Sequence, residues 1–136
     1  MNSERSNGEP ILEFWSQLQQ FLDTRQSAAR TAGLDGAAYD LLLALKAFPR
    51  DMDANISAMS RRLMLQHRVA ARTVRRLVRQ GLVRTRRSRY DRRSHALQLT
   101  PKGERLLGRL ASKSLAGLAY DGPPLVASLR HLHISA

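Results

Sequence analysis

The basic residues of this chain gather in one segment, and this gathering constrains the fold more than any other feature. Between residues 61 and 109 there are 16 Lys or Arg and two acidic residues, a formal charge of +14, whereas the rest of the 136-residue chain carries −2. Apolar residues recur through the segment at helical and strand spacing, so we expect it to fold. Such a dense cationic surface suits a polyphosphate partner. A solvated basic face or a membrane-surface patch is the less specific alternative.

Residues 66–80 predict an amphipathic helix with one apolar and one cationic face. Apolar residues and one threonine line the first face, and arginines recur on the second at i, i+4, i+7 and i+11: Arg68, Arg72, Arg75 and Arg79. Gly81 follows at the position where a left-handed residue commonly ends a helix. A short helix over residues 56–63, with Asn55 as its N-cap, precedes it by a tight turn.

The elements around this helix pair predict a winged helix-turn-helix. Residues 82–86 and 95–99 indicate two short strands joined by an arginine-rich loop, a β-wing. Two helices are expected before the pair, over residues 11–31 and 37–48. After the wing, Thr100 and Pro101 begin a helix that reaches about Tyr120, and a turn at residues 121–124 leads to a short last segment. The fold class is therefore mainly α with a small β-wing.

Composition excludes several classes of function. The chain has no cysteine, which removes disulfides, thiolate metal sites and a cysteine nucleophile. No apolar run is long enough to cross a bilayer and the N-terminus does not resemble a signal peptide, so we expect a cytoplasmic protein. No motif pairs a nucleophile with a base, and His131 and His133 have no further ligand nearby. We expect no enzyme activity, no cofactor and no metal.

Residues 91–103, DRRSHALQLTPKG, closely resemble the wing-to-helix signature of the MarR family of bacterial regulators. Residues 63–83 are similar to the turn and recognition helix of that family. The resemblance implies a single MarR-like domain over residues 1–136, with a winged-helix core at 37–103 and dimerisation helices at 11–33 and 104–136. It also implies a homodimer that binds a pseudo-palindromic operator, most often as a repressor, and in many members leaves the DNA when a small aromatic ligand binds.

The predicted DNA-binding residues lie at the start of the recognition helix, along its cationic face, on the preceding helix and in the wing: Ser57, Arg61, Gln66, His67, Arg68, Arg72, Arg75, Arg76, Arg87, Arg89, Asp91, Arg92 and Arg93. Four of these are the candidates for contact with base edges: Gln66, His67, Arg68 and Arg72. The wing pair Asp91 and Arg93 matches the family's acidic-x-arginine pair, in which the arginine enters the minor groove. A surface position for His67, and for Arg76 a salt bridge to an acidic residue of the second or third helix, are the structural alternatives.

Two features depart from the family pattern. The segment after Pro124 leaves little room for the long last helix that completes the dimer, and Gln66 is a weak N-cap for the recognition helix.

Trp15, Tyr39 and Phe48 are candidates for an aromatic ligand pocket, although helical spacing favours a role in the core. A nonspecific or architectural nucleic-acid-binding protein, and a protein-interaction module that retains the winged-helix fold, are the alternatives to a specific regulator.

Overall fold

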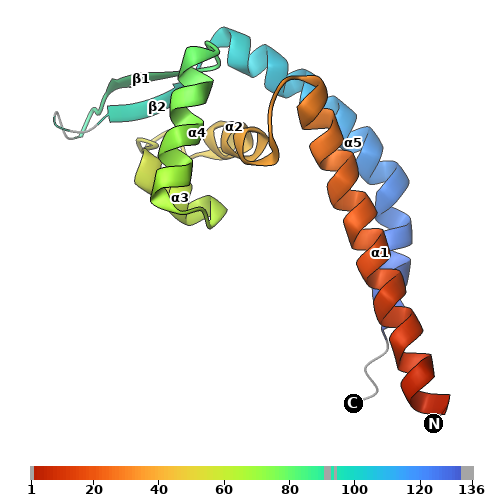
Figure 1. Cartoon of the computed structure of the whole chain (residues 1–136). Coiled ribbons are helices and arrows are strands. Elements are labelled where there is room, and N and C mark those ends of the chain that lie inside the picture. Colours follow the sequence, from red (N-terminus) through yellow and green to blue (C-terminus); the bar gives the residue numbers. More distant parts are fainter. Residues whose placement is uncertain (1, 91–92, 94, 133–136) are drawn as a thin grey trace.

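The computed structural model describes residues 2–90, 93 and 95–132, and over these the chain is mainly helical with a two-stranded wing, which confirms the predicted fold class. The elements are α1 (Asn2–Thr31), α2 (Gly36–Ala47), α3 (Ile56–Leu63), α4 (His67–Arg79), β1 (Val83–Arg87), β2 (His95–Leu99) and α5 (Pro101–Arg130). In Figure 1, α1 and α5 lie side by side as a long stalk that carries the other elements at one end. None of the described helices is both long and apolar enough to span a membrane.

Helices α2 and α3 begin at side-chain caps and pack with α4 around one apolar core. Asn55 accepts a hydrogen bond from the Ala58 N–H at 2.8 Å, which confirms it as the N-cap of α3, and Asp35 caps α2 through Ala38 N–H at the same distance. The largest fully buried apolar side chains come from α2, α3, α4 and β1: Leu41, Leu42, Met59, Leu77 and Val83. This core fixes the positions of α4 and of the wing relative to each other.

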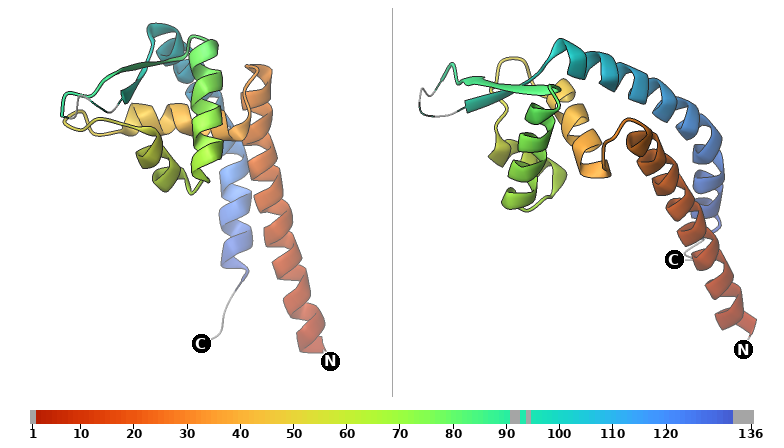
Figure 2. Two further views of the ribbon diagram at one scale, coloured as in Figure 1. Left: turned by 60° about the vertical axis from the view of Figure 1, so that its left-hand side comes forward. Right: turned by 45° about the horizontal axis from the view of Figure 1, so that its top comes forward.

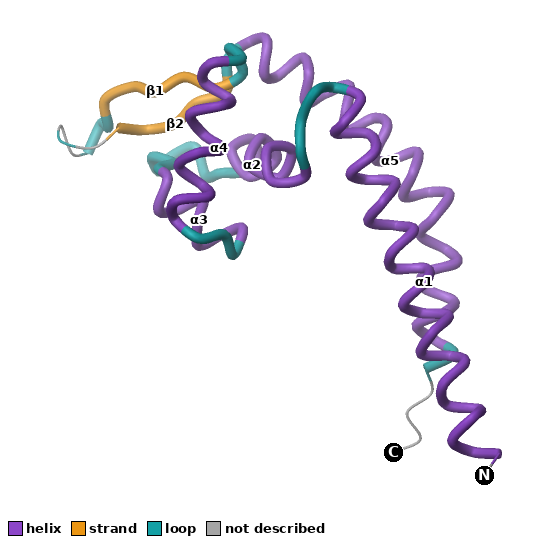
Figure 3. Tube along the Cα trace, viewed as in Figure 1, coloured by secondary structure: helices purple, strands orange, loops and turns teal. Residues whose placement is uncertain are grey.

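The wing is an antiparallel pair in which Val83 faces Leu99 and Arg87 faces His95. The second strand has the predicted bounds, and the first is shifted by one residue toward the C-terminus. The loop between α2 and α3 passes beside β2, as Figure 3 shows, and Leu97 N–H donates to the Ala54 carbonyl at 2.8 Å. The β2 edge of the wing is therefore held by this hydrogen bond to the α2–α3 loop.

The stalk differs from the sequence prediction at both ends. Helix α1 begins at Asn2, nine residues before the predicted start at Ile11, and Pro10 lies inside it. Helix α5 does not stop near Tyr120: it continues through residues 121–124 to Arg130, so the predicted turn and short last segment were wrong. The long last helix that the sequence pattern left little room for is present, and it curves along its length (Figure 2).

The prolines are tolerated because the bonds they remove lie on the solvent side of α5. Pro123 and Pro124 cannot donate to the carbonyls of Ala119 and Tyr120, and all four residues are exposed, so water can reach those carbonyls. Gly122 has no Cβ to clash with the ring that follows it. On the opposite side Asp121 and Ser128 are buried, and packing against α1 holds the helix together.

Candidate DNA-binding surface

Helix α4 divides into a buried face and an arginine face. Ala70, Thr73, Val74 and Leu77 are buried. The exposed face carries four arginines at the predicted spacing: Arg68, Arg72, Arg75 and Arg79. Val78, one of the apolar residues of this helix, is 39% exposed, whereas Ala70 is fully buried. The arginines are thus presented to solvent by a helix whose other side is fixed in the core.

The N-terminal end of α4 carries the predicted base-reading residues. Gln66 occupies the N-cap position without a side-chain capping bond; instead its Oε1 accepts from Arg68 Nε at 3.1 Å. Gln66, His67 and Arg68 are all exposed. A glutamine and an arginine that are already oriented beside each other can present acceptor and donor groups to neighbouring base edges.

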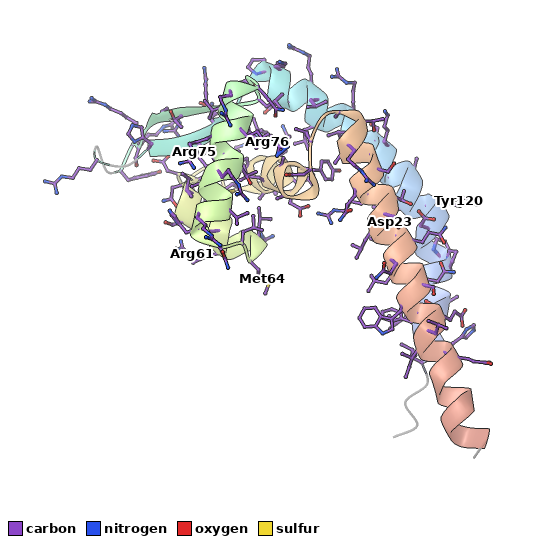
Figure 4. All side chains as sticks on the ribbon, in the orientation of Figure 1. Asp23, Arg61, Met64, Arg75, Arg76 and Tyr120 are labelled. Carbon is purple, nitrogen blue, oxygen red and sulfur yellow. The ribbon has the colours of Figure 1, made fainter. Side chains whose placement is uncertain are left out.

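The turn between α3 and α4 lies beside the N-terminal end of α4, as Figure 4 shows for Arg61 and Met64. Ser57 and Arg61 are exposed on α3, where both can reach a phosphate backbone. Ser60 Oγ donates to the Leu65 carbonyl at 2.7 Å and so closes the turn. Met64, 93% exposed, adopts a left-handed conformation with φ 55°, which costs a residue with a Cβ about 1–2 kcal/mol.

Arg76 differs from the other arginines of α4 because it has a partner within the chain. Its Nη1 donates to Asp35 Oδ2 at 2.9 Å, while Oδ1 of the same carboxylate caps α2. The structure therefore contains a salt bridge of the kind expected as the structural alternative for this residue, made to the N-cap of the second helix and not to a residue within it. Arg75, its neighbour, is exposed and makes no side-chain hydrogen bond or ion pair with another described residue.

The wing carries arginines on β1 and in its loop. Arg87, Arg89 and Arg93 are exposed, whereas Asp91 and Arg92 lie outside the described residues. Arg84 Nε donates across the sheet to Gln98 Oε1 at 3.2 Å. Because the wing projects away from the stalk beside α4 (Figure 2), the arginines of the two elements belong to one end of the molecule.

One acidic residue at the wing was missed by sequence reasoning. Asp53, in the α2–α3 loop, accepts hydrogen bonds from Arg86 Nη2, Ser88 Oγ and the Arg89 N–H at 2.6–2.8 Å. The hydrogen bond from Ser88, followed by those from Arg86 and Arg89 and the charge of Arg86, lowers the pKa of Asp53 despite some desolvation. No local pattern could have found this residue, because its partners are 33 to 36 positions away in the sequence.

Comparison with known proteins identifies a family with the same arrangement of helices and wing. A MarR family model matches residues 32–94, which span α2, α3, α4 and β1. The winged helix of this chain is similar to that of the MarR family. The resemblance predicted from residues 63–103 is thereby confirmed. A search of curated proteins finds no match to the chain.

Solved structures of MarR family proteins share the fold. A mutant of MarR from E. coli is 16% identical, with a TM-score of 0.70 over 86% of this chain and 88% of that chain. CouR from Rhodococcus jostii RHA1 bound to p-coumaroyl-CoA is 20% identical, with a TM-score of 0.67 over 75% of this chain and 70% of that one. The transcriptional repressor CouR bound to a 23-mer DNA duplex is 27% identical, with a TM-score of 0.62 over 71% and 66% of the two chains.

A cavity lies between the stalk and the winged helix. Its volume is about 200 Å³, and residues of α1, α2 and α5 line it, among them Phe21, Tyr39, Leu43, Ser114, Leu118 and Asp121. Tyr39 Oη and Ser114 Oγ share a hydrogen bond of 2.7 Å beside it. The structure does not bring the three predicted pocket residues together: Tyr39 lines the cavity, Trp15 is exposed on α1, and Phe48 packs against the core at the other end of α2.

Proposed function

We propose that this chain is a sequence-specific DNA-binding transcriptional regulator that acts in the bacterial cytoplasm as a repressor. The observation that carries the proposal is the row of exposed arginines on α4, next to the exposed arginines of the wing, at one end of a MarR family winged helix. The DNA-bound structure of CouR supports a duplex as the partner. Residues at the start of α4 would read bases in the major groove, and the wing would contact the minor groove.

The same proposal includes a homodimer formed by α1 and α5, with residues 37–103 as the DNA-binding core. Large apolar side chains remain exposed along the stalk: Ile11, Leu12 and Trp15 on α1 and Leu115, Val126 and Leu129 on α5, each at least 47% exposed. Covering them in a second copy removes apolar area from water, at about 25 cal/mol per Å². Two symmetry-related recognition helices then require a pseudo-palindromic operator.

Trp15 provides a direct test of the dimer, because it is the one tryptophan of the chain and is 55% exposed in the single copy. On dilution its fluorescence emission should shift to longer wavelength as the stalk interface separates, with the same midpoint that sedimentation gives for dissociation. A chain that stays monomeric at micromolar concentration, with red emission throughout, would favour the protein-interaction module.

The cavity beside Tyr39 supports a small aromatic effector. A volume of about 200 Å³ is below the roughly 300–1,000 Å³ of sites for drug-sized ligands, so it suits a single ring. Release of DNA requires that the ligand favour the state in which the recognition helices no longer match the operator. Titration calorimetry with single-ring aromatic compounds, on wild type and on Leu43→Trp, which fills the cavity, tests this part.

The main experiment is selection of bound genomic fragments by the purified protein. The best fragment and a scrambled duplex are then titrated at one near-physiological salt concentration. A pseudo-palindromic fragment bound about a thousandfold more tightly than the scrambled duplex supports a specific regulator. Near-equal affinities with a steep salt dependence would instead identify a nonspecific or architectural binder.

A further inference from the structure

The carboxylate of Asp53 binds the wing at three points. Arg86 Nη2 donates to Oδ1 at 2.7 Å, while Ser88 Oγ at 2.6 Å and the Arg89 N–H at 2.8 Å both donate to Oδ2. The aspartate side chain is 11% exposed, so these partners replace most of its contact with water. Both oxygens are thus used to hold the end of β1 and the start of the wing loop.

The loop that carries Asp53 contacts the wing at two further points. The Tyr90 hydroxyl donates to the Asp51 carbonyl at 2.6 Å, and Leu97 N–H donates to the Ala54 carbonyl at 2.8 Å. Residues 51–54 therefore contact β1, the wing loop and β2. Since Ala54 is buried in the core, the wing is fixed to the body of the domain and not only to its own hairpin.

A negative charge at this place opposes DNA binding by simple electrostatics. Polyphosphate is repelled by a carboxylate, and Asp53 also occupies Arg86, which is then not free to bind a phosphate. Asp53 therefore aids DNA binding only if the free energy gained by fixing the wing exceeds the electrostatic cost of its negative charge. Arg87 and Arg89, on either side of the anchored Ser88, are exposed.

We infer that Asp53 is a positioning residue for DNA binding: it locks the wing to the α2–α3 loop so that Arg87 and Arg89 are held where they meet the duplex. This inference rests on the proposed function. It assigns no base contact to Asp53. A free wing would have to lose conformational entropy on binding, whereas an anchored wing has lost it during folding.

The test compares Asp53→Asn with Asp51→Asn. Each substitution removes one negative charge from the same loop, but the Asp51 carboxylate makes no hydrogen bond or ion pair with the described residues. We expect D53N to bind the selected duplex about tenfold more weakly, with a salt slope lower by about one unit for each phosphate that the wing no longer neutralises. D51N should bind at least as tightly as the wild type.

A second readout does not need DNA. The Arg89 amide should be protected from hydrogen exchange in the wild type and in D51N, and should lose protection in D53N, with thermal unfolding of the helices little changed. Should D53N fail to fold, Ser88→Ala removes one of the three anchoring bonds and gives the same readouts at smaller amplitude.

The outcomes separate the two proposals. If wild-type protein binds no duplex, the proposed function fails, and with it the role of Asp53 in binding. If the wild type binds DNA and D53N binds as tightly as D51N, loss of one repelling charge explains both variants, and the positioning role of Asp53 is refuted. Retained Arg89 protection in folded D53N would refute the anchor itself.

Discussion

Gly103 stands where helix α5 passes closest to the wing, and its replacement by alanine should destabilise the protein strongly. A Cβ at this position would lie 2.1 Å from the Leu82 carbonyl oxygen and 3.0 Å from its carbonyl carbon. The same carbonyl accepts from the Thr100 N–H at 3.1 Å, and Thr100 Oγ1 accepts from the Gly103 N–H at 3.0 Å to cap α5. The glycine is therefore required because the start of α5 lies directly against the Leu82 backbone, at a junction that Thr100 also holds.

The magnitude follows from how far the junction must open. Restoring an ordinary contact of 3.4 Å to the oxygen needs a movement of about 1.3 Å, which breaks the Leu82–Thr100 bond. Overpacking costs about 1–3 kcal/mol, and the broken hydrogen bond and weakened cap cost about 1 kcal/mol each. Alanine gains about 1 kcal/mol over glycine as a helix former. We expect G103A to lower the free energy of unfolding by roughly 2–4 kcal/mol.

Gly108 is the matched control in the same helix. No atom lies within 4 Å of the place a Cβ would occupy and the residue is exposed, so Gly108→Ala should raise the free energy of unfolding by about 1 kcal/mol through helix propensity alone. Urea denaturation followed by far-UV circular dichroism, at one protein concentration, measures both variants. If G103A were as stable as G108A, the close approach of α5 to Leu82 would be refuted.

Three further predictions concern the DNA-binding surface and its supports. Arg72→Ala should weaken binding of the selected duplex by about 1–3 kcal/mol but change binding of a scrambled duplex less, in titrations at fixed salt; equal losses on both duplexes would make Arg72 a phosphate contact. Met64→Gly should raise the urea-derived stability by about 0.5–1 kcal/mol, because it removes left-handed strain at φ 55°, and a decrease in stability would contradict this. Because the anchor lowers the pKa of Asp53, its stabilisation is present above the ordinary value of 3.8 and is lost as pH falls through the lowered pKa. An NMR titration of the Arg89 amide should therefore show a transition below 3.8, and a transition above it would be inconsistent with the anchor.

Sequence predicted best those features whose causes are local. Asn55, Thr100 and Gly81 were identified as helix boundaries, and each acts through atoms within a few residues or through its own φ, which is +74° at Gly81. The arginine face of α4 was predicted correctly because helical periodicity alone separates it from the buried face. The winged-helix core follows from such signals.

The features that sequence missed depend on distant partners. In the sequence Asp53 is simply one acidic residue of a loop, and its partners Arg86 and Ser88 lie beside it only in the folded chain. The Asp-Gly-Pro-Pro run at residues 121–124 has the composition of a turn, and only packing against α1 keeps it helical. The packing of α5 along α1 compensates for the two helical hydrogen bonds that the prolines remove, and a rule based on local sequence does not include this packing.

The continuity of α5 has a consequence for how a signal would pass between the two parts of the molecule. One end of this helix is fixed to the wing through Thr100 and Gly103, and the other packs along α1 in the stalk. The Tyr39–Ser114 hydrogen bond ties its middle to α2, beside the cavity. A ligand that separates α1 from α5 must therefore move the winged helix relative to the stalk, since α5 belongs to both. In a dimer joined through the stalks, such a movement changes the spacing of the two α4 helices, and this spacing is what an operator with fixed half-sites selects.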